Sequence, residues 1–319
     1  MIRQNFNADW TVEKGDGNSR MNSFLGNTQT KTVHLPYDAM IHEARTPDTK
    51  NGAQTGFYPG GEYIFQKHFT APQAWQGKPV SLVFEGVYQT ALVYLNGWLL
   101  TRNVNGYAEF TVEAGPYLKY GADNLMKVIA DNSVEPNSRW YTGSGIYRPV
   151  RLLVGNKVYL PQDTVRITTR EVGEGFALLD VTAQVQSASA VTERVTLQQT
   201  ICREGTAVLT DRQNLLLQPG ESRTVSFRYC VDSPALWSQE NPNLYTSTMQ
   251  VLEGEEELDR EETSFGIRTL SIDASHGVRI NGQTVKLRGA CIHHDNGILG
   301  AATLPDAEER RIHQLKEAG

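Results

Sequence analysis

The sequence predicts an all-β protein of two consecutive sandwiches, followed by the beginning of a βα unit. Through residues 1–265, apolar and polar residues alternate in short runs, and long helical periodicity is absent. This alternation is the pattern of half-buried strands, and the Gly, Pro and Asn residues between the runs are typical of sandwich turns. The pattern changes after residue 265, where a hairpin, a loop and one helix-like stretch follow.

The first sandwich is predicted over residues 1–155. In the run KPVSLVFEGV, one face of a strand carries Val80, Leu82 and Phe84. In NLMKVIADN, both alternating sets are largely apolar, which indicates a strand buried on both faces. Asn96-Gly97 separates TALVYL from WLL and predicts a tight hairpin, because both residue types tolerate positive φ.

A second sandwich, of immunoglobulin-like type, is predicted over residues 156–268. Alternating runs such as ALLDVTAQVQS, RVTLQQTIC and RTVSFRYC recur with turn signals about every ten residues, which suits a sandwich of roughly 100 residues. The polar run EGEEELDREE is interpreted as a solvated hairpin. Cys202 and Cys230 could be neighbours in this sandwich, although free thiols are the favoured interpretation.

Composition and charge restrict the class of partner. The chain has 319 residues, a formal net charge of −6 and 21% charged residues, with Lys and Arg scattered rather than grouped. A nucleic-acid partner is therefore not expected, because it requires a basic face. No run is long and apolar enough to span a bilayer, and the first residues lack a signal-peptide core. Three distant cysteines favour a reducing compartment, so a cytoplasmic protein without a membrane partner is expected.

The last segment, residues 269–319, predicts a hairpin, a loop and a helix. The hairpin turns at Asn281-Gly282, and residues 303–318 have a helical period. Thr303 followed by Asp306 resembles a capping box, and Pro305 suits a first helical turn. A strand, a loop and a helix in this order begin a βα unit.

Five motifs in order resemble glycoside hydrolase family 2, which contains β-galactosidases, β-glucuronidases and β-mannosidases. They are TGFYPGGEYIFQKHF (55–69), FEGVYQTALVYLNGWLL (84–100), SRWYTGSGIYRPVRLLV (138–154), LWSQENPNLY (236–245), and FGIR (265–268) with NGQTVKLRGACIHHD (281–295). The resemblance implies a jelly-roll sugar-binding domain over 1–155, an immunoglobulin-like sandwich over 156–268, and the first strand, loop and helix of a truncated (β/α)8 TIM barrel over 269–319. The variant GACIHHDNGILGAA favours a β-galactosidase, which would hydrolyse terminal β-galactosides with retention.

The resemblance also indicates residues for substrate binding. His293 matches the family's substrate-contacting histidine, Asp295 matches more loosely, and His294 stands where many members have Glu. Asn103 resembles a loop residue that reaches the active site of β-galactosidases, although Asn105 is an equally good turn residue. For the His pair, sugar contact, structural hydrogen bonding and metal ligation are the three interpretations. Trp140 is expected to plug the sandwich or a domain contact, and Arg148 to pair with a carboxylate.

The resemblance places both catalytic glutamates beyond Gly319, so no catalytic residue is assigned and the chain alone is expected to be inactive. No cofactor is assigned, although the resemblance allows Mg or Na in the intact enzyme. Ser138 replaces the sodium-ligating Asp of some β-galactosidases. Residues from about 290 onward are expected to be poorly ordered or packed on a neighbour.

Two alternatives stay open beside the glycosidase. One is a stand-alone carbohydrate-binding module, in which Trp98, Tyr107 and Tyr141 stack on sugar rings. The other is a structural sandwich pair used for assembly, which would form homo-oligomers and bind no sugar. Fold alone does not separate the three.

Overall fold

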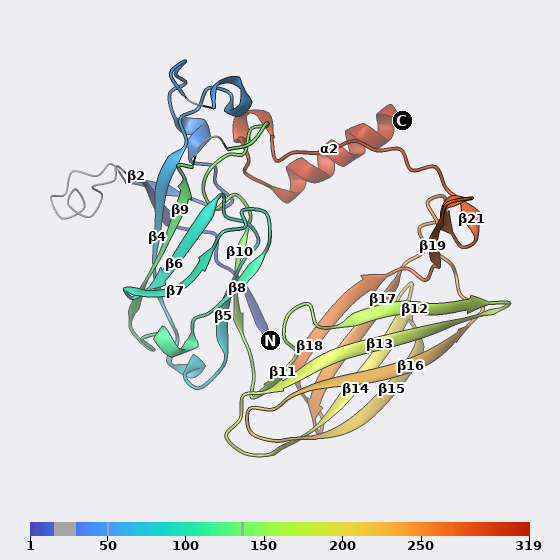
Figure 1. The fold of residues 1–319 in the computed structure, drawn as a ribbon. Coiled ribbons are helices and arrows are strands. Elements are labelled where there is room, and N and C mark those ends of the chain that lie inside the picture. Colours follow the sequence, from blue (N-terminus) through green and yellow to red (C-terminus); the bar gives the residue numbers. More distant parts are fainter. Residues whose placement is uncertain (16–29, 50, 135–136) are drawn as a thin grey trace. The chain divides into compact units, whose positions relative to one another are not determined.

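The computed structural model describes residues 1–15, 30–49, 51–134 and 137–319 (Figure 1). The chain divides into two compact units by its internal contacts. The jelly-roll unit contains residues 2–154 and 291–319, and the immunoglobulin-like unit contains Met1 and residues 155–290. Residues 269–319, which the sequence groups together, are therefore shared between the units.

The described part of the jelly-roll unit packs a four-stranded antiparallel sheet against a six-stranded one. The first has the order β1 (Ile2–Asn5), β10 (Val150–Val154), β5 (Val80–Phe84) and β8 (Phe110–Glu113), and the second has the order β3 (Lys31–Val33), β2 (Trp10–Gly15), β4 (Gly61–Thr70), β9 (Asp123–Asn132), β6 (Thr90–Leu95) and β7 (Trp98–Asn103). Short 3-10 turns join them at η1 (Met40–His42), η2 (Gly52–Thr55), η3 (Gln73–Trp75) and η4 (Gly115–Tyr117).

The strands follow from the alternation in the sequence. The predicted inward residues of β5, Val80, Leu82 and Phe84, are all buried. In β9 one face is fully buried and the other is half-buried, so the strand is covered on both sides as predicted, but not equally. The predicted hairpin joins β6 to β7, with φ of 52° at Asn96 and 88° at Gly97.

The described immunoglobulin-like unit is a second antiparallel sandwich of longer strands. One sheet contains β11 (Val158–Tyr159), β13 (Phe176–Ser187), β12 (Arg166–Gly173) and β16 (Ser222–Asp232), and the other contains β15 (Thr206–Leu217), β14 (Glu193–Arg203), β17 (Tyr245–Glu253) and β18 (Glu256–Phe265). The two sheets enclose one apolar cluster. Cys202, Cys230 and Cys291 are free thiols. The polar run after Glu253 is the predicted hairpin between β17 and β18.

The last segment starts with a small antiparallel sheet of β19 (Leu270–Asp273), β20 (Gly277–Ile280) and β21 (Gln283–Thr284), which turns at Asn281-Gly282 as predicted. The turn η5 (Gly297–Leu299) and the helix α2 (Pro305–Ala318) follow. The capping box is wrong: the N-cap is Leu304, without a side-chain hydrogen bond. The Thr303 hydroxyl instead bonds His294 and the carbonyl of Ala301, so it is unavailable to the helix.

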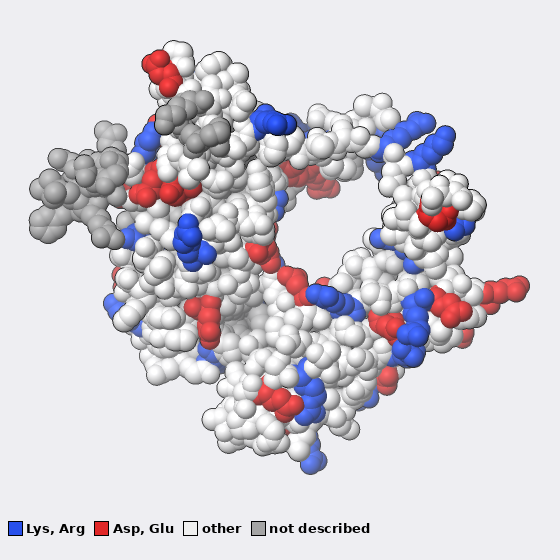
Figure 2. All heavy atoms as spheres, viewed as in Figure 1, with Lys and Arg blue, Asp and Glu red and all other residues white. Residues whose placement is uncertain are grey.

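On the face shown in Figure 2, Lys and Arg are interspersed with Asp and Glu rather than gathered in one patch. In the immunoglobulin-like unit, Lys157 joins Glu193 and Glu253 at 3.0 and 2.7 Å. Over the described ranges, no helix combines the length and apolar character required to cross a membrane.

A pair of amides, Asn124, which is buried, and Asn96, which is half-buried, supports the β6–β7 hairpin. Asn124 is fully buried, and its Oδ1 accepts hydrogen bonds from Asn96 Nδ2 and from the N–H of Lys119, both at 2.8 Å. Its Nδ2 donates to the carbonyls of Lys119 and Ala122 at 2.9 and 3.0 Å. The sequence identified Asn96 as a turn residue but did not identify its partner.

We expect Asn124→Ala to lower the free energy of unfolding by about 1–3 kcal/mol, because it leaves several buried donors and acceptors unpaired. Urea denaturation followed by tryptophan fluorescence measures the change. Lys119→Ala, which removes only an exposed side chain from the same turn, should stay within about 0.5 kcal/mol of the parent. Equal effects of the two variants would contradict the role of the amide pair.

Candidate functional site

The segment 291–304 docks on the jelly-roll unit through the carboxylate of Asp38. Asp38 is 1% exposed and lies just before η1. Its Oδ1 accepts from the N–H groups of Met40 and Ser144 at 2.9 and 3.0 Å, and its Oδ2 accepts from the Tyr141 hydroxyl at 2.5 Å and the Ala301 N–H at 2.8 Å. Burial and the adjacent carboxylate raise the pKa of Tyr141, so its phenol stays protonated and donates. The Asp38 carboxylate therefore joins its own segment to those that contain Tyr141 and Ala301.

Two glycines allow the chain to approach this carboxylate. Gly143 and Gly300 have φ of 67° and 60°. A Cβ on Gly143 would lie 2.4 Å from Ala301 Cβ, and a Cβ on Gly300 would lie 2.2 Å from Asp38 Oδ2. Both positions thus require glycine for backbone conformation and for space. The segment that was expected to be poorly ordered or packed on a neighbour instead binds here, against its own jelly-roll unit.

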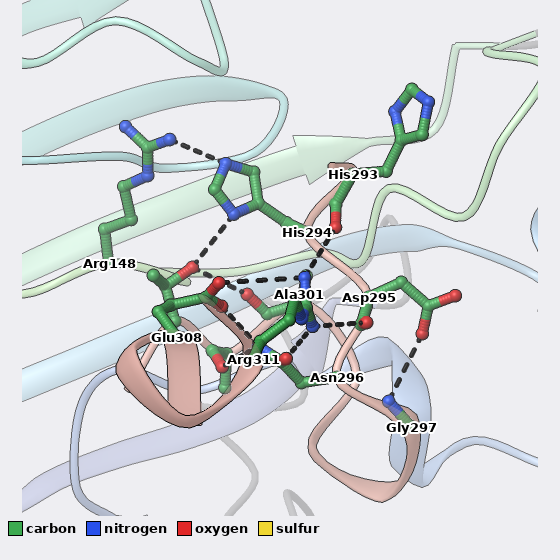
Figure 3. Close-up of polar contacts among 11 residues, drawn as sticks. Arg148, His293, His294, Asp295, Asn296, Gly297, Ala301, Glu308 and Arg311 are labelled. Carbon is green, nitrogen blue, oxygen red and sulfur yellow. Dashed lines mark hydrogen bonds and ion pairs between the residues drawn. The ribbon is translucent and has the colours of Figure 1, made fainter. Parts of the chain in front are cut away.

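His294 is held at both ring nitrogens (Figure 3). Arg148 Nη2 lies 2.6 Å from Nε2, and Thr303 Oγ1 lies 3.1 Å from Nδ1. Because a guanidinium only donates, Nε2 is the acceptor and Nδ1 carries the proton. The Thr303 hydroxyl then donates onward to the Ala301 carbonyl at 3.2 Å. The pKa of His294 is lowered, first by burial and then by Arg148, which favours this neutral form.

His293 points away from His294 and is exposed. Its ring stacks on Trp140, with centroids 4.7 Å apart and planes at 28°. Trp140 Nε1 donates to the Tyr107 hydroxyl at 3.2 Å. Trp140 is 38% exposed, so it does not plug the sandwich. One face of its indole contacts His293, which lies in the predicted third domain, so the other expected role, a domain contact, is the one observed.

Arg148 connects the two loops that the sequence associated with sugar. Besides His294, its Nη1 faces the carbonyls of Tyr107 and Glu85, each at 3.4 Å. Among the described residues, the partners of Arg148 are an imidazole and two carbonyls, so the prediction of a carboxylate partner is wrong. The neighbouring Arg151 pairs with Glu85 and Glu109 at 3.0 and 2.9 Å.

Asn103 ends β7, and its amide shapes the loop that follows. Its Nδ2 donates to the Asn105 carbonyl at 2.9 Å, and its Oδ1 accepts from the Asn105 N–H at 3.4 Å. Asn105 Oδ1 accepts from the N–H groups of Tyr107 and Ala108. Both asparagines are therefore turn residues in this structure, and the turn positions Tyr107 beside Trp140 and Arg148.

The helix α2 clamps the other side of the segment. Arg311 donates to the Asp295 carbonyl at 2.8 Å and to the side chain of Asn296, which in turn donates to Glu308 at 2.6 Å. The Asp295 carboxylate is exposed, and its Oδ1 accepts from the Gly297 N–H at 3.3 Å. The backbone of the predicted substrate-binding residues is thus fixed, while the Asp295 carboxylate faces solvent.

A pocket of about 550 Å³ lies beside Asp295. Its walls include Tyr58, with the guanidinium of Arg45 5.0 Å above the ring, and the half-buried Tyr141.

Within the described ranges, no three His, Cys, Asp or Glu side chains are grouped to hold a metal ion. The Ser138 hydroxyl donates to the Trp140 carbonyl at 2.6 Å and so belongs to a local turn.

The sequence did not identify Asp38 or Thr303 as site residues, and it identified Tyr107 only as a sugar-stacking ring of the alternative binding module. Asp38 lies in HLPYDAM, which carries no recognisable motif, and its partner Ala301 is 263 residues away. A histidine followed by a threonine nine residues later likewise has no pattern that predicts a hydrogen bond.

Comparison with known proteins places this architecture in a family of enzymes that cleave glycosidic bonds. The family model "Glycosyl hydrolase 2 galactose-binding domain-like" matches residues 10–166, and "Glycosyl hydrolases family 2" matches residues 158–268. The chain belongs to glycosyl hydrolase family 2.

The relatives cover nearly the whole chain but are much longer. Beta-galactosidase BoGH2A of Bacteroides ovatus is 35% identical over 99% of this chain, which spans 37% of its length. A putative beta-glucuronidase of Formosa agariphila is 30% identical over 100% of this chain, which spans 30% of its length. A solved family 2 member from Bacteroides cellulosilyticus superimposes with a TM-score of 0.91 at 33% identity, covering 100% of this chain and 42% of that chain.

We expect Asp38→Asn to lower the free energy of unfolding by about 1.5–3 kcal/mol, because a neutral amide replaces a carboxylate with four donors around it. Hydrogen exchange at Ala301 should accelerate in step, since its N–H loses a charged acceptor. Asp48→Asn, an exposed carboxylate of the same unit, is the control and should leave both unchanged. Unchanged exchange at Ala301 in Asp38→Asn would contradict the docking role.

Proposed function

We propose that this chain is the N-terminal part of a retaining β-galactosidase that hydrolyses terminal β-galactosides. The observation that carries the proposal is the stack of His293 on Trp140, which bonds Tyr107, because it brings His293 beside the loop that follows Asn103, another residue that the sequence predicts to contact sugar. The 35% identity to a protein named as a β-galactosidase supports the finer assignment.

In this proposal His293 and Asp295 hydrogen-bond sugar hydroxyls. The stacked imidazole is exposed and oriented by Trp140, and the exposed carboxylate of Asp295 accepts hydrogen bonds. Asn103 contributes by shaping the neighbouring loop. The two carboxyl groups that cleave the bond would lie outside residues 1–319, so the chain alone would not hydrolyse glycosides. A cytoplasmic location and a homo-oligomer stay predictions from the sequence.

A β-glucuronidase is the second candidate, because relatives with that name match the whole chain. The exposed carboxylate of Asp295 favours the neutral galactoside, since a glucuronate would bring a like charge beside it. A stand-alone carbohydrate-binding module is the third. Trp98 and Tyr107, which are 65% and 42% exposed, could stack on sugars, but the Tyr141 hydroxyl is already bound to Asp38.

Reading the gene beyond the codon for Gly319 and assaying its complete product tests the proposal. We expect hydrolysis of p-nitrophenyl β-galactoside, little hydrolysis of the β-glucuronide, and no turnover by residues 1–319 alone. The reverse preference would replace the galactosidase with a glucuronidase. A stop codon after Gly319, together with measurable galactose binding by the chain, would favour the binding module.

In the complete product, we expect His293→Ala to lower kcat/KM for the galactoside by about 10- to 100-fold, through loss of a sugar hydrogen bond. His313→Ala removes an exposed histidine of α2 and should leave kcat/KM unchanged. Steady-state kinetics at pH 7.5 measure both. A His293→Ala enzyme with parental kcat/KM would remove His293 from the site.

A further inference from the structure

His294 has no hydrogen-bonding group left for a sugar. Arg148 occupies Nε2 and Thr303 occupies Nδ1, at 2.6 and 3.1 Å. The ring also packs against Tyr147, with centroids 5.1 Å apart. Its neighbour His293 is exposed and makes none of these contacts. Adjacent histidines thus have opposite surroundings, which indicates different roles.

The contacts of the two histidines form a continuous ring that leads from His294 through Arg148, Tyr107 and Trp140 back to His293. Arg148 binds His294 and the carbonyl of Tyr107; the Tyr107 hydroxyl accepts from Trp140; and Trp140 stacks on His293, which is covalently joined to His294. The shortest noncovalent link is the one between Arg148 and His294, and the links from Arg148 and Trp140 to Tyr107 are longer. Removing the short link would leave the His293 ring held only by its stack on Trp140, while Arg311 still donates to the backbone carbonyl of His293 at 3.4 Å.

We propose that His294 is a positioning residue, which locks the 291–304 segment to Arg148 and thereby holds the His293 ring against Trp140. The inference rests on the proposed function only for the sugar-binding role of His293. The lock itself is a property of the jelly-roll unit and can be measured without substrate.

This lock, the hydrogen bond from Arg148 to His294 Nε2, should break in acid. A proton on Nε2 removes the acceptor for Arg148 and places two cations in contact. The other ionisable groups near the ring are Arg311 and Glu308 of α2 and His293; Glu308 alone among them favours the charged imidazole. Tyr147 stays protonated, because burial raises its pKa to about 12.

The sign of the pH effect follows from the lowered pKa of His294. The unfolded chain binds this proton near pH 6.5, whereas the folded chain binds it only at lower pH. The contribution of the neutral imidazole is therefore complete above about pH 6.5 and is lost as the pH falls toward the folded pKa.

Two substitutions distinguish the role of His294 as a hydrogen-bond acceptor for Arg148 from the titration of its imidazole. His294→Gln keeps an amide oxygen that can accept from Arg148, but it does not titrate. His294→Leu fills the space without an acceptor. His313→Gln removes an exposed histidine from α2 and is the matched control.

NMR of the 319-residue chain tests the lock. In ¹⁵N-histidine spectra, His294 should have its proton on Nδ1 and titrate below pH 6.5. The Trp140 indole resonance, assigned with Trp140→Phe, should move with the same midpoint. In His294→Gln the movement at the His294 midpoint should be absent, and at pH 7.5 the resonance should stand where it does in the parent. In His313→Gln it should behave as in the parent, and in His294→Leu it should be displaced even at pH 7.5. An unchanged Trp140 resonance in His294→Leu, or a His294 midpoint above pH 6.5, would overturn the proposal.

Kinetics of the complete gene product supply the second readout. His294→Leu should lower kcat/KM for its glycoside about 10- to 100-fold, as expected for a displaced binding group. His294→Gln should retain parental kcat/KM at pH 7.5 and lose less of it at pH 5.5. A 10- to 100-fold loss in His294→Gln at pH 7.5, matching His294→Leu, would indicate direct sugar contact and contradict the lock. If the NMR results hold and the product hydrolyses no galactoside, only the proposed function fails.

Discussion

The candidate site depends on the buried carboxylate of Asp38. Removing an ion from water is costly unless donors replace the lost hydration, and here four donors from three segments do so. Because one of these donors is the backbone of Ala301, the 291–304 segment is fixed by a directional bond rather than by a large apolar contact. The glycines at 143 and 300 make this geometry accessible, and a side chain at either would collide with the carboxylate or its neighbour.

A second fixed point lies at His294, where Arg148 and Thr303 hold the imidazole. Residues 295–300 are thus tied down at both ends, and Arg311 of α2 holds them from outside. Fixing both ends reduces the number of conformations that the intervening turn can adopt. The positions of the Asp295 carboxylate and of the neighbouring pocket wall are therefore set without an extensive apolar core. Polar contacts between distant segments therefore supply the order that strands supply elsewhere in the molecule.

The sequence predicted what local patterns determine. Alternation located the strands, and Asn96-Gly97 and Asn281-Gly282 located hairpins, because turn chemistry is local. Prediction from the sequence failed where a side chain could bond any of several partners. Thr303 was assigned to the helix end but bonds His294, and Arg148 was assigned a carboxylate but binds an imidazole. Asp38 carried no signal, since its role exists only after residues 263 positions apart have met.

The contribution of the jelly-roll unit to the proposed site is mainly one of position. Arg148, Trp140 and Tyr107 bond one another or the histidines, and the Asn103 amide bonds its own loop. Of the residues that the sequence predicts to bind substrate, His293 and Asp295 are exposed, and both lie on the 291–304 segment. A scaffold that holds two adjacent residues, one locked and one exposed, can keep a hydrogen-bonding group in place while leaving it free of competing partners. Such preorganisation is what directional recognition of hydroxyl groups requires, because a loosely held imidazole would have to be ordered at each binding event.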